Sequence, residues 1–144
     1  EPITSNWEQH DAPVGFGVLG TSMSESSGIF TFPATGYWLV SLRPYYRLSS
    51  TDGAARMINV TGSFTTDDFS SSNTPISVTQ GMEVISSDTT FATAYCQAIL
   101  DVINTSNYKI KFNFVRSDPN YTGRLVGSTS ELYTYCMFVR LGDT

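Results

Sequence analysis

The chain has 144 residues, of which 8 are Lys or Arg and 13 are Asp or Glu, so its formal net charge is −5. This length predicts a single domain, residues 1–144, large enough to bury a core without metal or disulfide crosslinks. The shortage of basic residues argues against nucleic acid as a partner, and no apolar run reaches the roughly 18 residues that a membrane span needs. The 37 serines and threonines, with only 15% charged residues, favour an all-β fold with an extracellular type of surface.

The predicted elements are strands throughout, because runs of strand length are bounded by clusters of Gly, Pro, Asn, Asp and Ser. A short strand at 3–8 and a polar turn at 24–27 come first. Further strands are predicted at 28–32, 37–47, 54–64, 75–85, 91–103, 108–116 and 132–141, with polar loops at 65–73 and 117–130. This number and spacing of strands indicate a sandwich or barrel, and their lengths fit a jelly roll.

The predicted strand at 37–47 is apolar on both faces. Its first half is a nearly unbroken apolar run made of Tyr37, Trp38, Leu39, Val40 and Leu42. An antiparallel strand with one face in water alternates apolar and polar residues instead. One face of this strand therefore belongs to the domain core, and the other requires a partner.

Two later predicted strands are also apolar on both faces. In 91–103, small apolar residues recur at every second position, and the alternate positions carry Tyr95, Gln97 and Ile99 but no charge up to residue 99. In 132–141 both sets of alternate positions are again mostly apolar. Three such strands side by side would expose a larger patch than a soluble monomer usually does, so we expect contact between subunits.

A family resemblance rests on the segment Gly28-Ile-Phe-Thr-Phe-Pro-Ala-Thr-Gly-Tyr-Trp-Leu-Val-Ser. It resembles the Phe, Thr, aromatic, Pro, Thr-Gly, aromatic, Leu stretch of the tumour necrosis factor and complement globular-head superfamily. The strands at 91–102 and 133–141 are also similar to that superfamily. Trp7-Glu8, the run at 15–20 and the ending Phe138-Val-Arg-Leu-Gly-Asp-Thr144 resemble globular domains of tailed-phage virion proteins, especially marine ones.

The resemblance implies a ten-stranded jelly roll that assembles as a homotrimer. By position, the residues implied to face the threefold axis are Leu39, Ser41, Tyr95, Gln97, Ile99, Tyr135 and Met137. Those implied to face the core are Trp38, Val40, Leu42, Cys96, Leu100 and Phe138. In such a sheet the 37–47 strand separates Cys96 from Cys136, so their sulfurs are implied to lie roughly 10 Å apart, too far for a disulfide.

Motifs for chemistry are weak. His10-Asp11 is a histidine beside a carboxylate, but no Gly-x-Ser-x-Gly elbow follows, so we interpret the pair as solvated turn residues. Asp67 and Asp68 lack the spacing of a calcium loop and are interpreted as part of a polar loop. We therefore expect no catalytic residue, no metal and no cofactor.

A binding surface is predicted from aromatic and guanidinium side chains, which stack on sugars and are common at protein interfaces. Its candidate residues are Tyr45, Tyr46, Arg47, Tyr121 and Arg124, and the loop carboxylates Asp67 and Asp68 are further candidates.

The predicted function is a non-enzymatic homotrimeric virion protein that decorates a capsid or forms a fibre head on the particle surface of a marine tailed phage. Its partners would be its own copies and other virion proteins, or a host-surface receptor or glycan. Three alternatives stay open: a eukaryotic extracellular ligand of the tumour necrosis factor or complement-head type, a monomeric carbohydrate-binding module, and a hydrolase that uses His10. Glycan on Asn59 or Asn104, each in an acceptor triplet, would favour the eukaryotic ligand.

Overall fold

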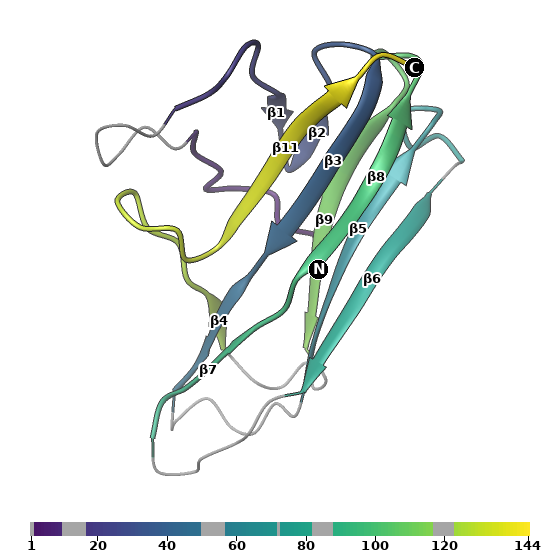
Figure 1. The fold of residues 1–144 in the computed structure, drawn as a ribbon. Coiled ribbons are helices and arrows are strands. Elements are labelled where there is room, and N and C mark those ends of the chain that lie inside the picture. The colour runs from purple at the N-terminus through teal and green to yellow at the C-terminus, as the bar shows by residue number, and fades with distance from the viewer. Residues whose placement is uncertain (1, 10–16, 50–56, 72, 82–87, 117–122) are drawn as a thin grey trace.

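The computed structural model describes residues 2–9, 17–49, 57–71, 73–81, 88–116 and 123–144. These residues form two layers of antiparallel strands that face each other, joined by turns and loops (Figure 1). The described part of the chain contains eleven strands and no helix, as the all-β prediction requires.

The first layer is a five-stranded sheet with the order β1-β2-β9-β5-β6. Every second residue of its central strands is apolar and points to the other layer, as strand geometry dictates. Its strands are β1 (Ser24–Ser26), β2 (Ile29–Thr31), β9 (Lys109–Arg116), β5 (Met57–Thr65) and β6 (Thr74–Gly81).

The second layer consists of a three-stranded sheet, β11-β3-β8, and its continuation, β10-β4-β7. One residue separates β3 from β4 and two separate β7 from β8, so the smaller sheet extends the larger one toward one end of the molecule (Figure 1). The strands are β11 (Tyr135–Gly142), β3 (Gly36–Arg43), β8 (Cys96–Val102), β10 (Arg124–Leu125), β4 (Tyr45–Leu48) and β7 (Thr90–Thr93).

Pro44 separates β3 from β4, which sequence analysis treats as one strand. Proline has no N–H to donate to a strand ladder, so the pairing with β11 cannot continue through it. The Thr134 side chain takes over at the break: the Tyr45 N–H donates to its Oγ1 at 2.9 Å. The predicted strand at 91–103 is divided in the same way, at Ala94 and Tyr95.

The core lies between the layers and is rich in aromatic rings. Phe30 of β2 packs against Phe138 of β11 with ring centroids 5.1 Å apart, and Phe32 packs against Trp38 at 5.4 Å. Trp38, Val40, Leu42, Cys96 and Leu100 are buried and Phe138 packs against them, so the core set that the family resemblance implies is confirmed.

Several predicted boundaries are wrong. Residues 3–8 form no strand, since only Pro2 makes a bridge, to Asn113, and Trp7 instead covers the core edge with its ring 5.1 Å from Phe30. The predicted turn at 24–27 contains β1, and the predicted loop at 117–130 contains β10. The last strand begins at Tyr135 rather than at residue 132. Residues 54–56 and 82–85 of two predicted strands lie outside the described residues.

Candidate functional site

The first candidate surface is the outer face of β11-β3-β8, the side that points away from the other layer. At its centre, β-sheet register places Leu39 of β3 between Val139 of β11 and Ile99 of β8. Ile99 is 63% exposed, Val139 is also exposed, and Leu39 between them is half-buried. This row of branched apolar side chains therefore meets water in the protomer, which carries a hydrophobic cost.

Six of the seven residues expected at a trimer axis lie on this side of the sheet, and Tyr95 comes directly before β8, but the seven differ in exposure. Tyr95, Gln97 and Met137 are exposed, and Tyr135 is half-buried. Ser41 is only 1% exposed, because its small side chain lies in register between Met137 and Gln97.

Tyr37 belongs to the same outer face and is 43% exposed, but sequence analysis does not select it or Val139. Both occupy the same alternate positions as Leu39 and Met137, so strand alternation alone is the signal that identifies them. The outer face of β11-β3-β8 thus carries more apolar surface than the predicted set.

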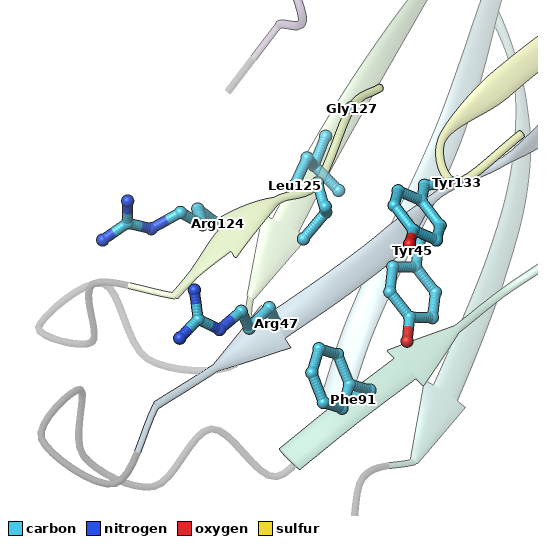
Figure 2. Close-up of a pocket in the computed structure, with 8 residues that line it drawn as sticks. Tyr45, Arg47, Phe91, Arg124, Leu125, Gly127 and Tyr133 are labelled. Atoms are coloured by element: carbon cyan, nitrogen blue, oxygen red, sulfur yellow. The ribbon is translucent and has the colours of Figure 1, made fainter. Parts of the chain in front are cut away.

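The second candidate surface is a groove of about 500 Å³ at the β4 end of the second layer. We call it the aromatic–arginine groove. Figure 2 shows three aromatic rings on one side and two guanidinium groups on the other. Its lining residues are Tyr45, Arg47, Phe91, Arg124, Leu125, Val126, Gly127 and Tyr133.

The aromatic side is a stack with Tyr45 at its centre. The Tyr45 ring lies 5.4 Å from the Phe91 ring and 5.3 Å from the Tyr133 ring, with interplanar angles of 16° and 17°. A hydrogen bond with the Glu131 carboxylate, and then its negative charge, raise the pKa of Tyr133 above its ordinary value. Tyr45 comes from β4, Phe91 from β7 and Tyr133 from the loop before β11. The stack therefore joins three distant parts of the sequence.

The basic side comes from the pairing of β10 with β4. In this register Arg124 lies directly opposite Arg47, and both residues are exposed. The Val126 N–H donates to the Tyr45 carbonyl oxygen at 2.8 Å and holds the chain after β10 against β4. Within the described residues, no carboxylate lies within ion-pair distance of either guanidinium.

Only some of the predicted binding residues come together in the structure. Tyr45, Arg47 and Arg124 come together in the groove, whereas Tyr46 is fully buried in the core, its ring 5.0 Å from the Phe114 ring. The prediction of Tyr46 as a surface residue is wrong because neighbouring residues of a strand point to opposite faces. Tyr121, and the histidine and aspartate at 10–11, lie outside the described residues.

Asp67 and Asp68 lie at the opposite end of the sandwich from the groove, after β5 (Figure 1). Asp67 accepts hydrogen bonds from the Thr65 hydroxyl at 2.8 Å and from the Ser71 N–H at 2.9 Å. Asp68 pairs with Lys109 at 2.5 Å. Both carboxylates therefore hold the turn together, and they are separate from the aromatic–arginine groove.

Two kinds of feature are absent from the described residues. Those residues contain no group of three or more His, Cys, Asp or Glu side chains arranged to hold a metal ion. They also contain no helix with the length and hydrophobicity that crossing a bilayer demands.

Comparisons with known proteins identify the fold. The solved structure of Eiger TNF from S. frugiperda matches with a TM-score of 0.51 over 82% of this chain and 67% of that chain, at 16% sequence identity. No family model and no curated protein sequence matches the chain. At this identity the likeness shows the fold alone, so the domain is an all-β domain with a tumour necrosis factor-like fold.

Proposed function

We propose that the chain is a non-enzymatic head domain that assembles as a homotrimer and acts by binding. The observation that carries this proposal is the outer face of β11-β3-β8, where Val139, Leu39 and Ile99 form an apolar row that the protomer leaves in water. A second copy of the same chain is the partner we propose for this face.

Two arguments support assembly through this face. The row at its centre is uncharged, and charged residues of the face, such as Arg43 and Asp101, lie nearer its ends, which is the layout of an interface core with a polar rim. The tumour necrosis factor-like fold, together with the sequence resemblance to a superfamily of trimers, favours three copies around an axis. Three copies would present each binding surface three times, so weak contacts with a repetitive target would add up.

We propose a virion as the setting: capsid decoration or the head of a fibre, on the outside of a phage particle. The resemblance of residues 7–8, 15–20 and 138–144 to phage virion proteins supports this setting. We also propose that the domain is not an enzyme. The aromatic–arginine groove offers rings and guanidinium groups, but its lining includes neither a carboxylate nor a thiol.

A second candidate is a secreted ligand of the tumour necrosis factor type, which the structural similarity to Eiger TNF favours. Asn104 is exposed and begins an acceptor triplet, whereas Asn59 donates from its side chain to Ser77 and Thr79. Glycan on Asn104 of the natural protein would support the secreted ligand. Capsid, portal or tail genes beside the coding sequence would support the virion.

The assembly is tested by the mass in solution. We expect sedimentation equilibrium to give about three times the protomer mass of 15.8 kDa. Ile99→Asp places a charge in the apolar row, and burying an unpaired charge is costly, so this variant should sediment as a folded protomer.

Val115→Asp is the matched control, because Val115 is 49% exposed on β9 in the other layer. It should sediment like the wild type. Circular dichroism of each variant checks the fold. A wild-type chain of protomer mass, or an Ile99→Asp variant as large as the wild type, would refute assembly through this face.

A further inference from the structure

We infer that the aromatic–arginine groove binds an acidic saccharide, a sugar ring that carries a carboxylate or a sulfate group. This inference rests on the proposed role as a binding domain, but it does not require three copies. It names a ligand class for a groove that assembly through the outer face leaves without a function.

Two basic side chains of the groove lack a partner among the described residues. Among the basic side chains that the structure describes, only Arg47 and Arg124 have no hydrogen bond, ion pair or ring contact with other described residues. The remaining ones are engaged: Arg43 with the Tyr133 carbonyl, Lys109 with Asp68, Lys111 with the Phe69 ring, and Arg140 with the Thr35 carbonyl and Asp143. Both unengaged guanidinium groups, those of Arg47 and Arg124, line the aromatic–arginine groove.

The placement of Arg47 and Arg124 opposes folding. Like charges directly opposite each other on neighbouring strands destabilise a sheet, and Arg47 and Arg124 have this relationship. The chain is acidic overall, with 13 acidic residues against 8 basic ones, yet it provides no described carboxylate for this pair. An external anion would relieve the repulsion and accept bidentate hydrogen bonds from a guanidinium.

The aromatic stack forms a wall of the groove. Phe91 is 50% exposed and Tyr133 is 37% exposed, so both ends of the stack retain free apolar surface beside the cations. A sugar ring has an apolar C–H face that can cover an aromatic side chain, while its anionic group reaches the guanidinium groups (Figure 2). A simple inorganic anion would leave this wall unused.

The number of cations limits the ligand. A polynucleotide presents a row of phosphates and is bound by many Lys and Arg side chains, whereas this groove offers two in a chain with a net charge of −5. One or two anionic groups on a small ring system fit the groove better. An acidic sugar at the end of a surface glycan has this character.

The experiment measures binding of three probes by NMR titration or calorimetry: 3′-sialyllactose, the neutral sugar lactose, and acetate. We expect 3′-sialyllactose to bind at least tenfold more tightly than either of the others, since it alone uses both sides of the groove. Arg47→Gln and Arg124→Gln should each weaken it about tenfold, the loss of one charge-assisted contact. Phe91→Ala should weaken it as well.

Arg140→Gln is the matched control, because Arg140 is engaged with Asp143 and the Thr35 carbonyl and lies outside the groove. It should leave the affinity unchanged. Any one of three results would overturn the inference. The first is no binding of 3′-sialyllactose, and the second is binding of acetate or lactose as tight as that of 3′-sialyllactose. The third is an affinity of the Arg47→Gln variant for 3′-sialyllactose equal to that of the wild type.

The same titration on the Ile99→Asp variant, with the mass recorded in each sample, separates the two proposals. A trimer that ignores the acidic sugar refutes the inference alone. A wild-type chain of protomer mass that binds it refutes the assembly alone, because only the Ile99→Asp variant is expected to be a protomer. We expect binding in both the wild type and the variant.

Discussion

Cys96 and Cys136 pair in register with the same residue, Leu42, from the two strands that flank β3. They are therefore separated by a whole strand and are both free thiols. The Cys96 thiol is buried and donates to the Ile76 carbonyl oxygen at 3.2 Å, across the core. This arrangement confirms the prediction that the two cysteines form no disulfide with each other.

Thiol reactivity gives the first prediction. Burial raises the pKa of both thiols, so less of the reactive thiolate forms. Cys96 is buried and Cys136 is half-buried, which limits the access of a reagent to sulfur. We expect a thiol reagent such as DTNB to modify two thiols per chain rapidly in denaturant and neither of them rapidly in the native protein. Fast native modification of either thiol would contradict the packing described for β3 and its neighbours.

The second prediction concerns alkaline pH. Burial raises the pKa of the Cys136 thiol from its ordinary value of 9.0 to about 12. Because the folded pKa is above the unfolded one, the stabilisation from a neutral thiol is complete below about pH 9. It falls as pH rises from 9 to 12, by at most about 1.4 kcal/mol per pH unit.

The measurement is the free energy of unfolding between pH 8 and 10.5 in reducing buffer, for the wild type and Cys136→Ala. Tyr and Lys residues also titrate in this range, so the informative quantity is the difference between the two proteins. We expect the advantage of the wild type to shrink with rising pH. Val115→Ala, which changes a side chain that does not titrate and lies in the other layer, should give a difference that is constant with pH.

Much of the fold could be predicted from strand alternation. The alternate positions of β8 assign Leu100 to the core without any structure, because they form a continuous apolar ladder with a period of two. β3 is apolar on both faces, so the family resemblance, and not alternation, assigns Trp38 and Val40 to the core. The breaks at Pro44 and at Ala94–Tyr95 were not predicted. Pro44 is itself a signal in the sequence, because proline has no N–H to donate to a strand ladder. The break at Ala94–Tyr95 has no such signal, and only the partner strands show it.

The aromatic–arginine groove could be predicted only in part. Tyr45 and Arg47 are recognisable as a surface pair within one strand, but Phe91 and Tyr133 join them through tertiary contacts between segments far apart in the chain. The position of Arg124 depends on β10, a strand of two residues, which is too short for any pattern to reveal. Tyr46 lies in the core and not at the surface because neighbouring residues of a strand point to opposite faces.

The third prediction concerns Gly36, the glycine of the Thr-Gly pair in the resemblance segment. Its φ is +131°, and a Cβ there would collide with the backbone carbonyl oxygen of Gly142 at the end of β11. Glycine adopts this backbone conformation without penalty, whereas other residues are strained by about 1–3 kcal/mol. Gly36→Ala should lower the free energy of unfolding by at least that amount in urea denaturation.

Gly81→Ala is the control for this measurement, because a Cβ at Gly81 meets open space and its φ lies outside the glycine-specific region. It should change stability by about 0.5 kcal/mol or less. Equal stability of the two variants would mean that β3 does not enter the sheet beside Gly142 as described.

The fourth prediction concerns Phe112, at the centre of the aromatic core. It is 1% exposed, and its ring centroid lies 5.8 Å from that of Phe30 and 6.3 Å from that of Phe138 in the other layer. Truncation leaves a cavity between the layers, so Phe112→Ala should cost about 3–5 kcal/mol of unfolding free energy. Trp7 also packs on this ring at 6.1 Å, so its fluorescence should shift toward that of a solvated indole.

Val115→Ala on the same strand is the internal control, because this side chain is exposed and its truncation should cost about 0.5 kcal/mol or less. Wild type and variants must be compared at one protein concentration, since assembly adds to the apparent stability by mass action. A Phe112→Ala cost near that of Val115→Ala would show that the two layers do not share the aromatic core that positions both candidate surfaces.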